Sequence, residues 1–243
     1  MKTDGPRRTS QGLKLTLAAL LTALALQPAA AAQSFAVSNL EQTTFGFGAL
    51  DVTSPVAVQF TVGPPPEGLT GWTLDKITGH ILGARGNPGS FEARILNDDS
   101  GSPGPIDSPL ATLTGPDPRS AGRYDFLSPA GTTISLEPET SYWLAYTSAG
   151  LPSTSDYYRI YLTSRRDQAG LQGWSIGNDS LRVNRNTGVW EAARIFGNSI
   201  VMKFGVEATP VPEPSEYALF FALGLGAFAL WHRRRQQGQR AAA

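Results

Sequence analysis

The chain has 243 residues, and its 20 Lys and Arg balance 20 Asp and Glu. It contains no cysteine, which excludes disulfides, thiolate catalysis and Cys-ligated zinc or iron–sulfur centres. Region 33–210 carries 12 basic and 17 acidic residues, a net charge of −5. Because these charges are scattered and form no basic stripe, we predict no nucleic-acid partner.

The N-terminal segment has the pattern of a secretory signal peptide. Basic residues precede an apolar run over Leu15–Leu26, and Ala30–Ala32 supplies the small residues that signal peptidase needs before Gln33. We expect the general secretion machinery to export the chain and residues 1–32 to be removed. Export by the twin-arginine route is a weaker alternative, because Arg7-Arg8 is not followed by the apolar residues of that signal. An uncleaved N-terminal membrane anchor is also weaker, because it would need a longer apolar run.

Region 33–210 is predicted to be one all-β domain. Val56–Val62 alternates with a period of two, and Phe91–Leu96 repeats that pattern. No stretch keeps a helical period, while Gly and Pro recur about every ten positions, so we expect an antiparallel β-sandwich of jelly-roll type. Further strands are expected at Leu110–Leu113, Thr132–Leu136, Ser141–Thr147, Tyr157–Thr163 and Ile200–Val206.

A turn-rich stretch follows Phe91–Leu96 and predicts a hairpin with a long loop before Leu110–Leu113. Calcium takes oxygen ligands from irregular loops of extracellular domains. However, the stretch lacks the alternating acidic residues of an EF-hand loop. Asn and Asp beside Gly and Pro also occur in turns that bind no metal. We therefore favour a plain turn and predict no cofactor, with calcium as the alternative. The candidate ligands are Asn97, Asp98, Asp99 and Asp107.

Two stretches of this region resemble a known family. Ile95–Gly104 and Leu136–Leu144 are similar to the extracellular β-sandwich domains called choice-of-anchor, most nearly the R type. The resemblance spans about Phe45–Val206 and implies an exported surface domain of the kind that occurs with different C-terminal anchors. It implies no activity, because the family has no established catalytic residues.

The titratable residues do not indicate catalysis. His80 is the single histidine of region 33–210, so a Ser-His-Asp triad would have to use it, and it lies in an expected strand over Lys76–Leu82. Gly101-Ser102-Pro103-Gly104 does not have the Gly-x-Ser-x-Gly spacing of a serine nucleophile, and it lies in an expected turn. A glycosidase needs only two carboxylates, so it stays open as a distant alternative. We predict that the chain is not an enzyme and assign no catalytic residue.

Aromatic residues are the stronger candidates for binding. If Tyr158 points inward, the period of two turns Tyr157, Arg159 and Tyr161 outward together. Exposed rings beside arginine can stack on sugars and donate hydrogen bonds to hydroxyls, although aromatic residues more often fill sandwich cores. Trp174, flanked by loop-forming residues, is the tryptophan that we expect to be exposed. The other aromatic residues considered are Trp72, Trp143, Trp190, Tyr124, Tyr142 and Tyr146.

The C-terminal segment has three parts in a fixed order. Pro212-Glu213-Pro214 precedes an apolar run over Tyr217–Trp231, which Arg233, Arg234 and Arg235 end. A helix over that run would be about 22 Å long, a short transmembrane anchor for a hydrocarbon core of about 30 Å, and a buried core helix is the alternative. The arginines are expected in the cytoplasm and the Pro-Glu-Pro step outside. We expect a sorting segment over 211–236 and a cytoplasmic tail over 237–243.

This order resembles the PEP-CTERM signal. The resemblance implies export by a Gram-negative bacterium, transient anchoring in the inner membrane and processing by a membrane protease-transpeptidase called exosortase. Such a tail is a sorting signal, and it does not indicate the function of the domain that it sorts. We therefore expect a non-enzymatic protein of the cell surface or extracellular matrix, linked to polysaccharide or biofilm. The alternative function is a carbohydrate-binding module for exopolysaccharide.

Overall fold

The computed structural model describes residues 35–149, 155–164, 168–195, 198–213 and 222–233. The expected signal peptide, with Ala30, Ala32 and Gln33 at its cleavage site, lies outside the described residues, and so do Pro214, Arg234 and Arg235. The described chain is all-β except for one short helix over 222–233. This confirms the expected fold class.

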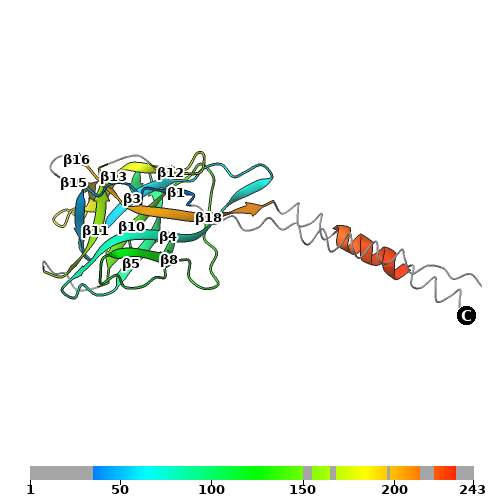
Figure 1. The fold of residues 1–243 in the computed structure, drawn as a ribbon, viewed down its shortest axis with the longest axis horizontal. Helices are drawn as coiled ribbons and strands as arrows, with labels where there is room; N and C mark the ends of the chain where they lie inside the picture. Colours follow the sequence, from blue (N-terminus) through cyan, green and yellow to red (C-terminus); the bar gives the residue numbers. More distant parts are fainter. Residues whose placement is uncertain (1–34, 150–154, 165–167, 196–197, 214–221, 234–243) are drawn as a thin grey trace, which may run out of the picture. The chain divides into compact units, whose positions relative to one another are not determined.

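The strands form two large antiparallel sheets that face each other as a β-sandwich-like domain (Figure 1). The first sheet runs β12-β1-β18-β4-β11-β17, with β2 on β11 and both β8 and β9 on β4. Its strands are β1 (Val37–Ser38), β2 (Gly46–Leu50), β4 (Leu69–Arg85), β8 (Gly122–Leu127), β9 (Ser135–Leu136), β11 (Tyr157–Thr163), β12 (Ala169–Gly170), β17 (Val201–Met202) and β18 (Phe204–Pro212).

The second sheet runs β14-β13-β3-β10-β5-β6, with β7 on β5. Its strands are β3 (Val56–Thr61), β5 (Phe91–Asp99), β6 (Ser102–Pro103), β7 (Ala111–Leu113), β10 (Ser141–Ser148), β13 (Ser175–Val183) and β14 (Trp190–Ala192). A separate hairpin pairs β15 (Arg194–Ile195) with β16 (Asn198–Ser199).

The core lies between the sheets and follows the period of two. Val56, Val58 and Phe60 all point into it from β3, and Phe60 meets Phe204 of the opposite sheet with ring centroids 6.5 Å apart. A smaller apolar cluster around Trp143 and Leu96 covers the outer side of the second sheet. Burial on both sides explains why β3 and β10 carry apolar residues on both of their faces.

The hairpin after β5 is tighter than expected. β5 and β6 are joined by the two-residue turn Ser100-Gly101, with φ of 54° and 88°, and not by a long loop. Positive φ at both central residues suits the twist of a hairpin, and glycine accepts it without strain. The return strand was predicted correctly, because β7 pairs with β5.

Strand β18 continues past the domain boundary expected at residue 210. Val211 pairs with Gly71 and Pro212 with Leu69, so the first proline of the expected sorting motif belongs to the sheet. Part of the expected transmembrane run, residues 217–221, lies outside the described residues. Within the part of the chain that is described, no helix has both the length and the apolar character needed to span a bilayer.

Candidate functional site

Strand β11 presents the predicted stripe on the outer side of the first sheet. Tyr158 and Ile160 are buried in the core, whereas Tyr157, Arg159 and Tyr161 alternate with them and are partly exposed. The alternation confirms that these three side chains share the outer face.

Neighbouring strands widen this stripe into a row across the sheet. Phe47 of β2 lies directly opposite Tyr161, and its side chain is 51% exposed. On the other side, the ring of His80 lies 4.3 Å from that of Tyr161, and Arg123 of β8 is paired with His80 in register. Cross-strand neighbours on one face come close enough for side-chain contact. The row therefore combines rings and cations drawn from four strands.

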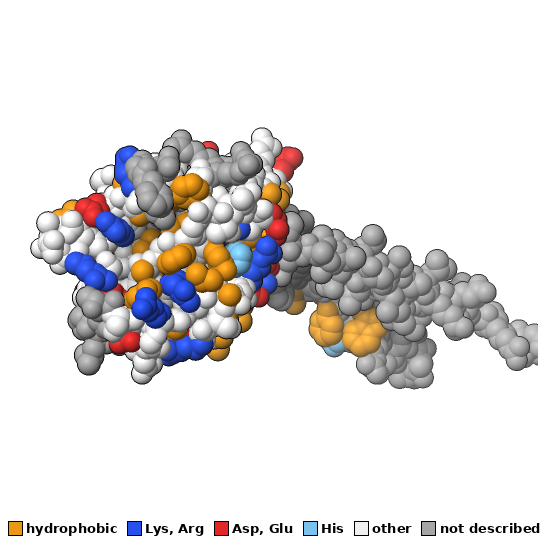
Figure 2. All heavy atoms as spheres, turned by 60° about the vertical axis from the view of Figure 1, so that its left-hand side comes forward, with side chains coloured by type: hydrophobic (Ala, Val, Ile, Leu, Met, Phe, Trp, Pro, Cys, Tyr) orange, Lys and Arg blue, Asp and Glu red, His pale blue; other side chains and the backbone are white. Residues whose placement is uncertain are grey.

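Two arginines lie beside these rings. The Arg159 guanidinium carbon is 5.9 Å from the centroid of the Phe47 ring. Arg85 lies 5.6 Å from the Tyr157 ring and donates a hydrogen bond of 2.9 Å from Nη1 to the Tyr157 hydroxyl. Figure 2 shows hydrophobic side chains gathered on one face of the domain, with Lys and Arg side chains and a histidine among them. We call this surface the β11 face and define it as Phe47, His80, Arg85, Tyr157, Arg159 and Tyr161.

Lys203 adds a charge from within the protein. It lies where the chain passes from β17 to β18: its N–H donates to the carbonyl of Tyr161, and its carbonyl accepts from the N–H of His80. Lys203 is 5% exposed, and its Nζ donates to the Gln42 carbonyl and to the Thr44 hydroxyl. Burial, with the nearby Arg123 charge, lowers the pKa of Lys203, while Glu41 opposes that shift. Both hydrogen-bond acceptors of this ammonium are uncharged.

The surroundings of His80 favour its neutral form. Burial lowers its pKa, and the charges of Lys203 and Arg123 lower it further, while Glu41 opposes the shift. Its Nδ1 is buried without a hydrogen-bond partner among the described residues. With the imidazole against Tyr161, His80 contributes a flat ring surface to the β11 face.

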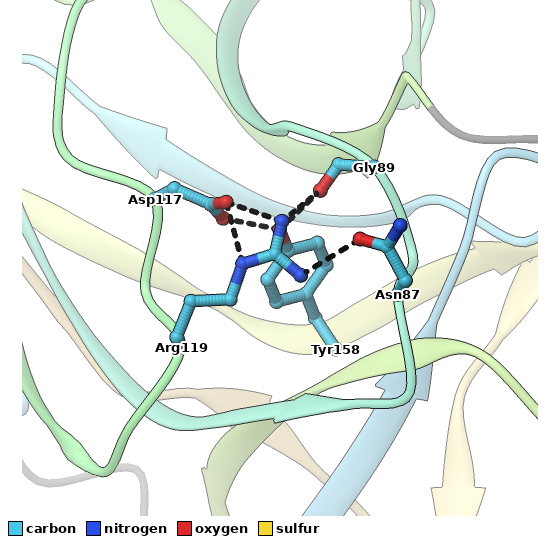
Figure 3. A network of polar contacts seen from close by, with 5 residues as sticks. All are labelled: Asn87, Gly89, Asp117, Arg119 and Tyr158. Atoms are coloured by element: carbon cyan, nitrogen blue, oxygen red, sulfur yellow. Dashed lines mark hydrogen bonds and ion pairs between the residues drawn. The ribbon is translucent and has the colours of Figure 1, made fainter.

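A polar network fixes the loops at the Tyr157 end of the face (Figure 3). The Tyr158 hydroxyl donates to the Gly89 carbonyl and to the Asp117 carboxylate, and Arg119 pairs with the same carboxylate. Arg119 also donates to the Asn87 side chain and to the Gly89 carbonyl. Burial and the Asp117 charge raise the pKa of Tyr158, so the phenol stays protonated and remains a donor. The network joins the loop after β4 to the loop before β8.

The expectation that Trp174 is exposed was wrong. Its side chain is 4% exposed and packs edge-on against Trp72, with ring centroids 5.3 Å apart. Gly173, with φ of 82°, turns the chain so that this indole enters the core, and a Cβ on Gly63 would lie 2.6 Å from it. The loop-forming residues beside Trp174 therefore let the chain turn its indole into the core. Trp72 and Trp143 are also buried, and Trp190 packs on the smaller cluster.

The calcium candidates form a hydrogen-bonded turn. Asp98 accepts hydrogen bonds from the Trp143 indole, the Gln59 side chain and the Gly101 amide. Asn97 accepts from the Gly104 amide through its carbonyl, and Asp107 is exposed. Asn97 and Asp98 line an open hollow of about 580 Å³, where Glu137 and Glu139 also lie. Among the described residues, no three His, Asp or Glu side chains come together in a way that would hold a metal ion.

Sequence reasoning missed Phe47, His80, Arg85 and Lys203 as members or neighbours of the β11 face. Phe47 and Ala49 of β2 alternate with Gly46 and Gly48, a signal that could have identified Phe47. The other three lie far from β11 in the sequence, so only strand pairing brings His80 and Lys203 to Tyr161 and Arg85 to Tyr157. Comparison with models of protein families finds none that matches this chain, and comparison with curated proteins finds no significant match.

Proposed function

We propose that this chain is an exported, non-enzymatic protein of the cell surface or extracellular matrix, and that its domain binds extracellular polysaccharide through the β11 face. The observation that carries the proposal is the row in which the exposed ring of Phe47 and the partly exposed rings of Tyr161 and His80 lie beside arginine. Rings pack against the apolar faces of sugars, and guanidinium groups donate to hydroxyls. A strand scaffold holds these groups in place before the ligand arrives.

Export and sorting belong to the same proposal. Residues 1–32 act as a signal peptide, and the segment from Pro212 resembles the PEP-CTERM signal, so an exosortase-like membrane protease is the proposed partner after signal peptidase. The domain is then a jelly-roll-type sandwich of the choice-of-anchor kind, held briefly in the inner membrane and afterwards placed at the surface or in the matrix.

Display without ligand binding is the second candidate, and the buried tryptophans favour it. Trp72, Trp143 and Trp174 all support packing, so the binding surface depends on Phe47, Tyr157 and Tyr161. A glycosidase finds less support. Hydrogen bonds lower the pKa of Asp98 and of Asp125 despite their partial burial, whereas a general acid needs a raised pKa.

Affinity electrophoresis tests polysaccharide binding. The full chain, in a mild non-ionic detergent, should be retarded in gels that contain the extracellular polysaccharide of the producing bacterium. Phe47→Ala and Tyr161→Ala should each weaken binding by about 1–3 kcal/mol, because each removes one ring from the contact. Val189→Ala, a change at an exposed apolar residue in the turn before β14, is the matched control and should migrate like wild type. Unchanged wild-type mobility in the polysaccharide would leave display as the function.

A further inference from the structure

We propose that the β11 face prefers an acidic polysaccharide, one whose sugars carry carboxylates, over a neutral one. This inference rests on the proposed function and names the class of ligand. Its basis is the distribution of ion pairs among the described residues: three cations on or beneath this face have no carboxylate partner there, whereas six others of the domain have one.

Among the described residues of the domain, six Lys and Arg side chains pair with a carboxylate. They are Lys76, Arg94, Arg119, Arg123, Arg182 and Arg185. The pairing follows from a domain whose acidic residues outnumber its basic ones by 17 to 12. In such a domain, a basic side chain without an acidic neighbour is the exception.

Three exceptions lie on or directly beneath the β11 face. Arg85 donates to the Tyr157 hydroxyl, Arg159 lies over the Phe47 ring, and Lys203 donates to a carbonyl and a hydroxyl. None of the three has a described carboxylate within ion-pair distance. Arg159 also keeps its buried Nε without a partner among the described residues. The face therefore has positive charge that the described part of the domain does not neutralise.

Lys203 makes this charge more effective. A buried ammonium is weakly screened by water, so it attracts an anion above it more strongly than a solvated lysine would. At the edge of the face, Arg123 pairs with Glu41, and the side chain of Glu41 is 82% exposed. A solvent-exposed pair of this kind is weak, so an incoming carboxylate can replace Glu41 as partner of Arg123.

The arrangement suits a sugar acid better than a simple anion. Arg159 and Tyr161 are two residues apart on one side of β11, about 7 Å along the strand. A sugar ring on Tyr161 would place a carboxylate attached to that ring within reach of Arg159. The planar guanidinium can donate two parallel hydrogen bonds to a carboxylate. A neutral hydroxymethyl group accepts hydrogen bonds from a guanidinium less strongly.

Binding to alginate, compared with alginate whose carboxylates have been reduced to alcohols, tests the proposal. The two polymers have the same chain and differ in charge. The full chain in mild detergent should bind alginate at least about tenfold more tightly at low salt, because hydrogen bonds to charged groups are the stronger ones. Arg159→Gln should lower the alginate affinity about tenfold and leave the affinity for the reduced polymer unchanged. Arg182→Gln, which removes a cation of β13, is the matched control and should behave as wild type.

Each other outcome contradicts a defined part of the argument. Equal affinity for the two polymers would overturn the preference for an acidic polysaccharide and leave the proposal of polysaccharide binding intact. Binding to a neutral polysaccharide of the producing bacterium, with no binding to alginate, would have the same consequence. Single-stranded DNA that binds as tightly as alginate would show attraction to any polyanion and would overturn the proposal. Failure to bind any polysaccharide, including the bacterium's own, would remove the proposed function as well.

Discussion

Replacing Asp98 by alanine should destabilise the domain by about 2–4 kcal/mol. The Asp98 carboxylate accepts hydrogen bonds of 2.6 Å from Trp143 Nε1, 2.8 Å from Gln59 Nε2 and 2.9 Å from the Gly101 amide. Trp143 is 4% exposed, so its N–H would lose its acceptor inside the protein, which costs about 1–3 kcal/mol. Loss of the other two bonds adds about 1 kcal/mol, since water can partly replace the carboxylate there.

Thermal unfolding followed by tryptophan fluorescence measures this effect. For a domain of this size, the expected loss lowers Tm by roughly 5–15 °C. Asp107→Ala, an exposed change in the same loop, should stay within about 0.5 kcal/mol of wild type. Equal stability of the two variants would refute the structural role of Asp98. A wild-type Tm that rises on addition of calcium, with the rise lost in Asp98→Ala, would favour a metal site over the plain turn.

The contribution of Asp98 should also depend on pH. Burial alone would raise its pKa, but the hydrogen bonds from Gly101, Trp143 and Gln59 together lower it below the usual value. A carboxyl whose pKa is lower in the folded than in the unfolded state stabilises the fold above the unfolded pKa of about 4, and this contribution disappears as pH falls through the folded pKa. The stability difference between wild type and Asp98→Asn should therefore be constant near neutral pH and shrink in acid. A difference that grows below pH 4 would contradict this assignment.

Three further predictions concern the core, the loop network and the tail. Trp174→Ala should cost about 3–5 kcal/mol in stability, measured by urea unfolding, and leave the polysaccharide affinity of the folded fraction unchanged; reduced affinity would return Trp174 to the binding surface. Tyr158→Phe should cost about 1–2 kcal/mol by the same assay, since Gly89 and Asp117 lose their shared donor, and an unchanged midpoint would count against the network. Glu213→Ala should leave an unprocessed, membrane-retained precursor, and replacing Arg233–Arg235 should displace or release the anchor. Mass spectrometry would contradict processing if extracellular wild-type protein still extended to Ala243.

The outward stripe of β11 was predictable because a strand turns alternate side chains to opposite faces. Tyr157, Arg159 and Tyr161 follow that rule whatever lies beside them. Trp174 was not predictable in this way. Its glycine and polar neighbours indicate a loop, but a loop next to a strand can turn one large ring into the core, where burial of its apolar surface is favourable. Local sequence predicts which way a side chain points within a regular strand, but it does not predict this where the chain bends.

The sequence by itself determined the all-β class and the inward residues of β3 and β18, since the period of two and the spacing of Gly and Pro are local properties. It also determined that no cysteine chemistry takes place. Only the tertiary structure decided that Phe47 and His80 meet at Tyr161, that Arg85 lies beside Tyr157, and that Lys203 lies buried next to Tyr161 and His80. These residues come from strands separated by long stretches of chain, and their contact depends on strand order and register. Both are set by the packing of the whole core, which no single segment contains.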